Sequence, residues 1–254
     1  MMLFSKVDVH ALVFKDATKT PAGGQHVFID TSATNRASPQ FQLAEKMRVP
    51  FGIRSASLDG TDDGPRKNME VSVDDEDVQA FLRGLDERVL QEAADRSKEW
   101  FKKKLTVEQV ATLFRPSMAQ DDAGKFAPLL RIKVNADTAK RPPRVFVATP
   151  SPDGGMKYLP GTLDDCPPQS HVTPVVELGG VWLINKGCGI TFTCTDLLVY
   201  PASTAPQAFP FQVTGDFSTV SEDGGTEASM ASKLKQGQLD VVKISDVADG
   251  EGKA

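Results

Sequence analysis

The sequence has no long apolar run and only three cysteines. No stretch of its 254 residues approaches the ~20 consecutive apolar residues of a membrane-spanning helix, so we expect no membrane association. The start of the chain, Met1 to Lys6, is soon followed by Asp8 and His10, and we expect no signal peptide. An odd number of cysteines without CxxC spacing favours a reduced, intracellular setting over a disulfide framework.

The sequence also lacks the short motifs of common enzyme classes. It contains no GxSxG, P-loop, HExxH or convincing GxGxxG sequence, and Gly187-Cys188-Gly189 lacks the third glycine of a phosphate-binding loop. Cys188, between glycines, could be exposed, but no histidine or acid stands beside it to make it a nucleophile. His10, His26 and His171 lie far apart, which is more typical of structural histidines than of metal ligands. We therefore expect no enzyme, no metal and no cofactor.

Short apolar segments separated by glycine and proline predict a mainly β fold with inserted helices. Residues 129–134 alternate, so Leu130, Ile132 and Val134 should face the core while Arg131 and Lys133 face the opposite side. Residues 172–178 and 181–184 flank Gly179-Gly180 and predict a hairpin closed by a glycine turn. The other expected strands are residues 9–14, 26–30, 68–73, 144–148 and 190–195, and residues 41–53 form either one more strand or a bent pair broken at Pro50 and Gly52.

One long helix is expected after Asp74 or Asp75, either of which is a suitable N-cap. Apolar residues from Val78 to Ala93 recur at 3.6-residue spacing, and Trp100 and Phe101 could continue that buried face. The capping-box sequence from Thr106 to Gln109 predicts a second, short helix running to about residue 114.

Positive charge gathers in the middle of the chain. Residues 96–144 hold twelve Lys and Arg against five acids, a local net charge of +7; because the whole chain carries −5, the remainder sums to −12. Aromatic side chains are interspersed with these cations. Such a mixture suits a polymer with a charged backbone and flat bases, since cations bind phosphate and rings stack on bases. A solvated helix end would equally explain the lysine run, and core packing in a hairpin would explain Trp182.

Four segments of this sequence resemble one known family. They are residues 100–106 (Trp-Phe-Lys-Lys-Lys-Leu-Thr), Phe114-Arg115-Pro116, residues 125–133 (Lys-Phe-Ala-Pro-Leu-Leu-Arg-Ile-Lys) and residues 181–190 (Val-Trp-Leu-Ile-Asn-Lys-Gly-Cys-Gly-Ile). They are similar to segments of the single-stranded DNA-binding proteins of nucleocytoplasmic large DNA viruses, which are similar in turn to those of short-tailed phages. The resemblance implies an OB-like barrel with a helix inserted between strands, located in the nucleus or at a viral replication site in the cytoplasm.

The C-terminal part departs from the phage pattern. Residues 216–254 hold eight acids, four lysines and one aromatic, so they have little to bury. Proteins of the phage type end in an acidic tail with a terminal aromatic, which docks polymerases and occupies the empty DNA groove. Here the chain ends Gly250-Glu251-Gly252-Lys253-Ala254, without that aromatic. The acidic charge of this segment still suits competition with DNA for the groove. The specific docking of a polymerase, however, lacks the terminal aromatic on which it depends in the phage proteins.

These observations predict an OB-like Greek-key barrel in residues 1–214, with a long helix, followed by an acidic, disordered C-terminal tail in residues 215–254. The expected function is non-catalytic binding of single-stranded DNA in replication or recombination, with replication proteins docking on the tail and a homodimer left open. The alternatives are a structural or scaffold β-protein that binds an acidic partner protein, and an enzyme whose site forms only in three dimensions. The expected DNA-binding residues are Phe101, Lys102, Lys103, Lys104, Arg115, Lys125, Phe126, Arg131, Lys133, Lys140, Arg141, Arg144 and Trp182.

Overall fold

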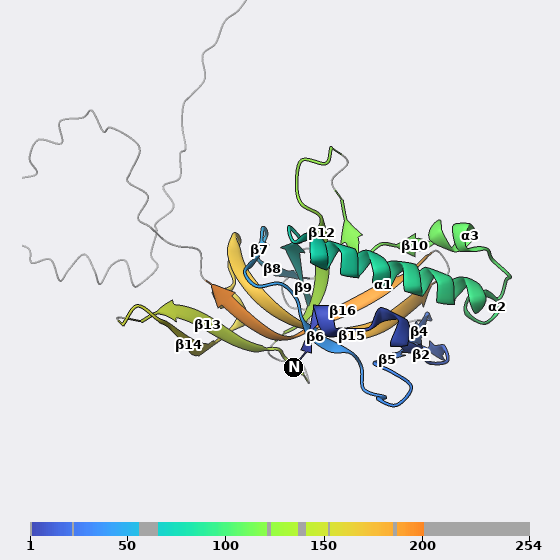
Figure 1. Ribbon diagram of the computed structural model, residues 1–254, viewed down its shortest axis with the longest axis horizontal. Helices are drawn as coiled ribbons and strands as arrows, with labels where there is room; N and C mark the ends of the chain where they lie inside the picture. Colours follow the sequence, from blue (N-terminus) through green and yellow to red (C-terminus); the bar gives the residue numbers. More distant parts are fainter. Residues whose placement is uncertain are drawn as a thin grey trace, which may run out of the picture. The chain divides into compact units, whose positions relative to one another are not determined.

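The computed structural model describes residues 2–21, 23–55, 66–120, 123–136, 141–151, 153–184 and 187–200. Within this part of the chain the fold is mainly β with one long helix, as expected, and its main sheet is mixed (Figure 1). The expected tail (residues 215–254), its boundary with residues 1–214, and Lys140 lie outside the described residues. Among the residues described, no helix combines the length and the apolar character needed to cross a bilayer.

Two long antiparallel strands, β15 (Ser170–Ile184) and β16 (Gly187–Tyr200), organise the sheet. Strand β16 also pairs in parallel with β10 (Phe114–Arg115), β12 (Leu129–Asn135) and β13 (Arg144–Pro150). The main path through the sheet is β1 (Met2–Leu3), β6 (Gln40–Gln42), β15, β16, β12, β9 (Arg66–Ser72) and β8 (Ile53–Ser55).

Shorter strands complete the sheet and form a separate pair. Strands β3 (Thr18–Lys19) and β4 (Gln25–Val27) extend β15 on one side, and β7 (Met47–Val49) pairs with β15 further along. Strand β11 (Met118–Ala119) pairs with β12, while β2 (Val13–Phe14) and β5 (Ile29–Asp30) form a two-stranded sheet. The sequence reasoning missed β14 (Met156–Gly161), which pairs with β13 in the hairpin at the left of Figure 1.

The alternation predicted for β12 is confirmed. Leu130, Ile132 and Val134 are almost completely buried, whereas Arg131 and Lys133 are exposed on the other face. Strand β12 pairs antiparallel with β9, so Arg131 stands opposite Glu70 and Lys133 opposite Asn68. Register partners point to the same side of a sheet, and this outer face therefore carries charged and polar side chains from both strands.

The predicted hairpin at Gly179-Gly180 is wrong, because β15 runs through both glycines as one strand. The ladder with β16 shifts register between Leu178 and Gly180, which is a bulge rather than a turn. Gly180 adopts φ +112°, and a Cβ there would lie 2.2 Å from the carbonyl oxygen of Val27. Only glycine lets β4 approach this closely, so Gly180 serves contact with a third strand.

The long helix begins where the sequence predicts. Helix α1 (Glu76–Asp95) is capped by Asp75, whose carboxylate accepts hydrogen bonds from the N–H groups of Asp77 and Val78. Its buried positions include Leu82, Leu85 and Val89, which pack into the core. The helical turn then breaks at Arg96, and α2 (Ser97–Trp100) follows.

Two local predictions were wrong in part, one in its boundary and one in the type of element. Helix α3 (Val107–Ala111) has the expected capping box but ends three residues early, and Phe114 and Arg115 form strand β10 instead. At the start of the chain, η2 (Val9–Ala11) is a 3-10 helix rather than a strand, because the Asp8 carboxylate accepts hydrogen bonds from the backbone of His10 and Ala11.

Candidate nucleic-acid interface

Four of the predicted DNA-binding residues line one groove of about 520 Å³: Arg115, Arg131, Lys133 and Trp182. Strand register explains how they meet. Gly189 on β16 pairs with Arg115 on one side and with Trp182 on the other. Lys133 on β12 pairs with Thr193 further along β16. Residues that are separated by up to 67 positions, from Arg115 to Trp182, therefore reach the same face of the sheet.

The cations of this groove are only partly neutralised. The Nε and Nη2 atoms of Arg131 donate hydrogen bonds of 3.0 and 2.7 Å to Oε1 of Glu70, and two-thirds of the Arg131 side chain stays exposed. The Lys133 ammonium donates to Oγ1 of Thr191 at 3.4 Å. Among the described residues that line the groove, Glu70 is the only acid, so three cations face one carboxylate, a net +2.

Two further arginines, not predicted from the sequence, extend the positive face. The first is Arg66, which lies near Lys133. Partial burial lowers the pKa of Lys133, and the positive charge of Arg66 lowers it further. Arg54 on β8 lies 3.9 Å from Glu70. Arg66 and Glu70 alternate with buried Met69 and Val71 on β9, so a period-2 pattern could have placed Arg66 on this face. Mutual repulsion between cations indicates a local positive potential that an anionic ligand would relieve.

Two aromatic side chains from the described part of the chain line the groove, and Trp182 is the less buried of them, because Phe192 belongs to the core. The Trp182 side chain is half-buried, and its indole lies across the backbone of Gly189, where a Cβ would come within 2.8 Å of the ring. One side of the indole thus packs on the sheet while the ring also lines the groove. The sequence supports two hypotheses for Trp182, core packing and base stacking. The half-buried ring combines features of both, since it packs on the sheet and also lines the groove.

A buried carboxylate holds one rim of the groove. Asp86 on α1 accepts a hydrogen bond of 2.9 Å from the backbone N–H of Ser117 and one of 2.5 Å from its hydroxyl. Burial raises the pKa of Asp86 to about 6, although the bonds from Ser117 act in the opposite direction. Ser117 lies between β10 and β11, so this contact fixes the segment that carries Arg115.

The aromatic and lysine run at residues 100–104 belongs to a different hollow. Phe101, Lys102 and Lys103 line a space of about 330 Å³ together with Leu183 and Ile184. Trp100 is buried, as the core hypothesis predicts, and Phe101 packs half-buried against the core. The Lys102 ammonium donates to the carbonyl of Glu99 at 3.0 Å.

The remaining predicted residues lie elsewhere. Phe126 is 71% exposed and lines a third pocket, considered below. Arg144 forms an ion pair with Asp196 at 2.5 Å, and neither it nor the exposed Lys104 and Arg141 lines either hollow described above. Lys125 is exposed on the segment between β11 and β12.

The cysteines are poor nucleophiles. All three are free and buried, and burial raises the pKa of the Cys166 and Cys188 thiols to about 11 and that of Cys194 to about 12. The sequence hypothesis that Cys188 could be exposed is therefore wrong. Among the residues that the structure describes, no group of three His, Cys, Asp or Glu side chains could hold a metal ion.

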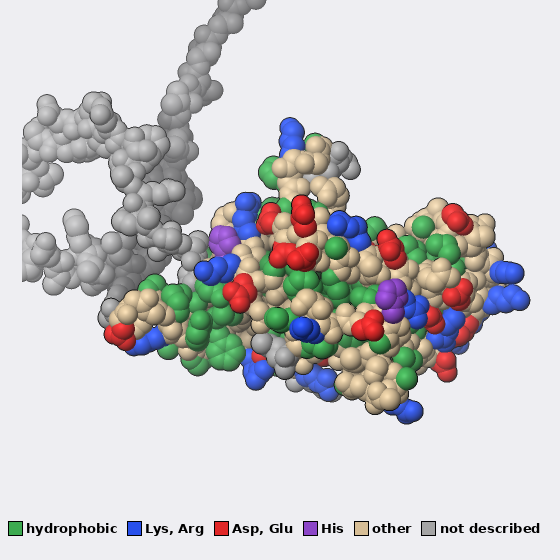
Figure 2. All heavy atoms as spheres, in the orientation of Figure 1, with side chains coloured by type: hydrophobic (Ala, Val, Ile, Leu, Met, Phe, Trp, Pro, Cys, Tyr) green, Lys and Arg blue, Asp and Glu red, His purple; other side chains and the backbone are tan. Residues whose placement is uncertain are grey.

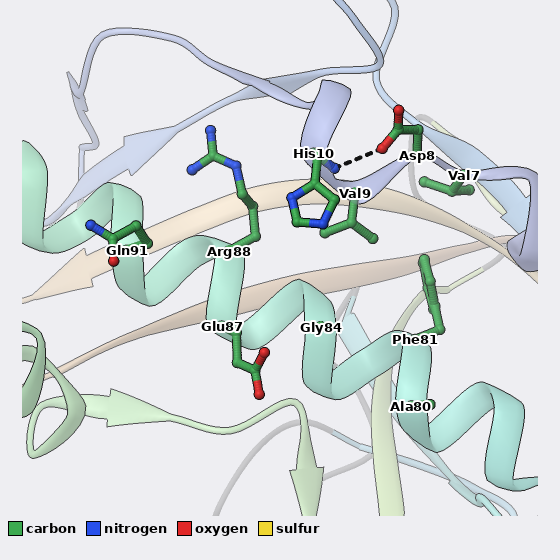
Figure 3. Close-up of a pocket in the computed structure, with 10 residues that line it drawn as sticks. All are labelled: Val7, Asp8, Val9, His10, Ala80, Phe81, Gly84, Glu87, Arg88 and Gln91. Carbon is green, nitrogen blue, oxygen red and sulfur yellow. Dashed lines mark hydrogen bonds between the residues drawn. The ribbon is translucent and has the colours of Figure 1, made fainter.

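A separate hollow of about 510 Å³ lies between η2 and α1 (Figure 3). Two of its charged groups already have partners: the carboxylate of Asp8 accepts a hydrogen bond from the backbone of η2, and the guanidinium of Arg88 pairs with Glu92 and lies over the ring of Phe14. The face seen in Figure 2 carries acidic and basic side chains interspersed around this region. It therefore offers no concentration of one charge comparable to the groove at Trp182.

Comparisons with known proteins found similar solved structures only. No family model matches the sequence, and no curated protein matches it. The chain is similar to gp2.5, a single-stranded DNA-binding protein encoded by bacteriophage T7, with 13% identity, a TM-score of 0.39, and coverage of 81% of this chain and 100% of that chain. It is also similar to the single-stranded DNA-binding protein from bacteriophage Enc34 (10% identity, TM-score 0.37, covering 73% and 88%). The same Enc34 protein in complex with single-stranded DNA gives 12% identity and a TM-score of 0.37, covering 72% of this chain and 93% of that chain. At such low identities and TM-scores, we base the function of this chain on its own residues.

Proposed function

We propose that this protein binds single-stranded DNA without catalysing a reaction, and that it protects and organises unpaired strands in replication or recombination. The observation that carries the proposal is the groove of about 520 Å³ in which Arg115, Arg131 and Lys133 stand beside the indole of Trp182. Cations bind phosphates and release counterions, and an indole stacks on any base, so the combination suits an unpaired strand of arbitrary sequence.

The same features favour a single strand over a duplex. In a duplex the bases are stacked on one another, and their faces are not available to Trp182. A duplex also presents phosphates over a wide surface, whereas the chain carries a net charge of −5 and concentrates its positive charge locally. Binding then depends on the local potential of the groove rather than on overall charge.

The hollow at Phe101, Lys102 and Lys103 contributes secondary phosphate contacts in this proposal, as do Lys104, Lys125, Lys140 and Arg141. Arg144 contributes less, because Asp196 already pairs with it. Arg54 and Arg66 join the interface through their position beside Glu70 and Lys133.

Several finer features belong to the proposal. Strand β7 lies beside β9 as well as pairing with β15, which supports a closed, OB-like Greek-key barrel. The proposed domain spans residues 1–214, and the acid-rich residues 215–254 form a separate tail in this proposal. The proposal also includes kinship with the single-stranded DNA-binding proteins of large DNA viruses and an intracellular location. Its partners in this proposal are replication proteins that dock on the tail and a second copy of the chain in a homodimer.

Fluorescence anisotropy with labelled oligo-dT at several salt concentrations tests the proposal. We expect saturable binding that strengthens with oligonucleotide length and weakens as salt rises. Lys133→Ala should weaken binding, while Lys6→Ala, which removes an exposed lysine on η1 (Phe4–Lys6), should not. A scaffold protein would give no saturable, length-dependent signal, and that result would overturn the proposal.

A further inference from the structure

An apolar pocket of about 560 Å³ adjoins the groove. Ala119 on β11 and Leu129 on β12 line both spaces, so the groove and this pocket are neighbours across the β11–β12 pair. Residues 123–128, which precede β12, project from the sheet in Figure 1. A single DNA strand that leaves the cations of the groove and crosses the β11–β12 pair therefore reaches the pocket next.

Two exposed phenylalanines line the pocket from separate elements. Phe126 is 71% exposed and precedes β12, and Phe51 is 44% exposed in the turn between β7 and β8. Exposing large rings to water is unfavourable, and a pair of exposed rings around one concave space commonly marks a binding site. Folding alone does not explain why these rings are left uncovered.

Hydrogen bonds hold the backbone beside both rings. Gln169 donates its backbone N–H to the carbonyl of Val49 at 2.8 Å and its side-chain amide to the carbonyl of Pro50 at 2.9 Å, which holds the turn that carries Phe51. Gln120 donates its side-chain amide to the carbonyl of Phe126 at 3.2 Å. The guanidinium of Arg54 lies 4.3 Å from the centre of the Phe51 ring. These contacts reduce the ordering that Phe51 needs before a flat ligand binds.

The charge of the pocket differs from that of the groove. Its charged lining residues are Arg48 and Asp74, one of each sign, and its other lining groups include Pro50, Ala127 and Leu129. A phosphate gains little in such a neutral, apolar space. A nucleobase suits it, because it is flat and uncharged and has polar edges that Ser72 or Gln120 could meet.

We propose that this pocket is a base-binding subsite, in which one unpaired base of the strand in the cation groove stacks on Phe51 or Phe126. The proposal rests on the proposed function, since the groove supplies the phosphates on either side of that base. It adds a fixed position at which the strand places a base, so contacts are not spread evenly along the bound nucleotides.

The test combines pocket variants with abasic oligonucleotides, measured by anisotropy on the full chain. Phe51→Ala with Phe126→Ala should weaken oligo-dT binding roughly tenfold or more, as expected for loss of base stacking. Replacing one nucleotide at a time by an abasic unit should reveal one position that weakens binding to the wild type. The same abasic unit should cause no further loss in the double variant, because the base and the rings form one contact. Phe126→Ala alone, at a 71% exposed position, should show part of the effect without affecting folding.

Matched controls separate the possible outcomes. Phe146→Ala removes another exposed phenylalanine, on β13 and outside both hollows, and should leave binding unchanged. If the pocket variants bind every oligonucleotide like the wild type while Lys133→Ala weakens binding, the subsite is overturned and the proposed function stands. If Phe146→Ala weakens binding as much as Phe126→Ala, the assignment to this pocket is wrong. If neither Lys133→Ala nor the pocket variants change binding, both proposals fail.

Discussion

The indole of Trp182 lies across Gly189, its register partner on the neighbouring strand, and a Cβ at position 189 would come within 2.8 Å of the ring. The backbone carbonyl of Arg115 lies 3.1 Å from the same point, so the glycine admits both neighbours of the groove at once. The absence of a side chain here thus sets the position of the proposed stacking ring.

Gly189→Ala should therefore displace Trp182 and weaken binding of single-stranded DNA. The sequence has two tryptophans and Trp100 is buried, so the DNA-dependent change in tryptophan fluorescence should come mainly from Trp182. We expect a several-fold loss of affinity and a smaller fluorescence change, measured by titration with oligo-dT. Gly155→Ala is the control, because a Cβ there meets nothing within 4 Å. Unchanged quenching in Gly189→Ala would contradict the stacking role.

Lys133→Ala and Trp182→Ala should weaken binding of single-stranded DNA with different dependences on salt. Removing one phosphate contact lowers the slope of log affinity against log salt by about 1, so the Lys133 variant should approach the wild type at high salt. Removing the ring should cost about 1–3 kcal/mol at every salt concentration. The measurement is a salt titration of each variant, with Lys6→Ala as the charge control. Parallel losses in both variants would show that the two residues do not have separate roles.

Local patterns were sufficient to predict several elements. The Asp75 cap, the capping box at Thr106 and the alternation of β12 each depend on a few neighbouring residues, and each is confirmed. Long-range pairing defeated the same reasoning at Gly179-Gly180. Two adjacent glycines between apolar runs are typical of a turn, and only the approach of β4 to Gly180 shows why they form a bulge within β15.

Only part of the groove could likewise be predicted from local patterns. The sequence placed Arg131 and Lys133 on one face, because they alternate with buried residues in a single strand. It could not show that Arg115 and Trp182 would join them, since that depends on the pairing of β10 and β15 with β16. For the same reason it missed Arg54 and Phe51, which reach the site through β8 and the turn before it, whereas the alternation within β9 could have indicated the face of Arg66.

Asp86 should make the stability of the fold depend on pH. Its pKa is raised from 3.8 to about 6, so between these values the folded state binds more protons than the unfolded state. Stability should therefore fall as pH rises through this window, by at most about 3 kcal/mol from this one group. Asp86→Asn, which keeps an oxygen that can accept from Ser117, should flatten the dependence. Urea unfolding of both proteins between pH 4 and pH 7 measures the difference, and identical pH profiles would contradict the burial of a titrating carboxyl.

The two groups of cations provide the last prediction, because the structure assigns them to different hollows. Arg115, Arg131 and Lys133 line the groove with Trp182, whereas Lys102 and Lys103 line the hollow beside Phe101, and Lys104 lines neither. Replacing Arg115, Arg131 and Lys133 together by alanine should reduce affinity for oligo-dT by about 10- to 1,000-fold at low salt and lower the salt slope by up to about 3. The Lys102, Lys103 and Lys104 triple alanine variant, which removes the same net charge, should lose clearly less.

Equal losses in the two triple variants would mean that net charge rather than the groove governs binding. A larger loss in the lysine variant would move the primary site to the hollow at Phe101. Circular dichroism and thermal unfolding of both variants provide the control for folding, since the Arg131 variant also leaves Glu70 without that partner. The exposure of the Arg131 side chain keeps the expected cost of that lost ion pair within about 1 kcal/mol, so the binding comparison remains interpretable.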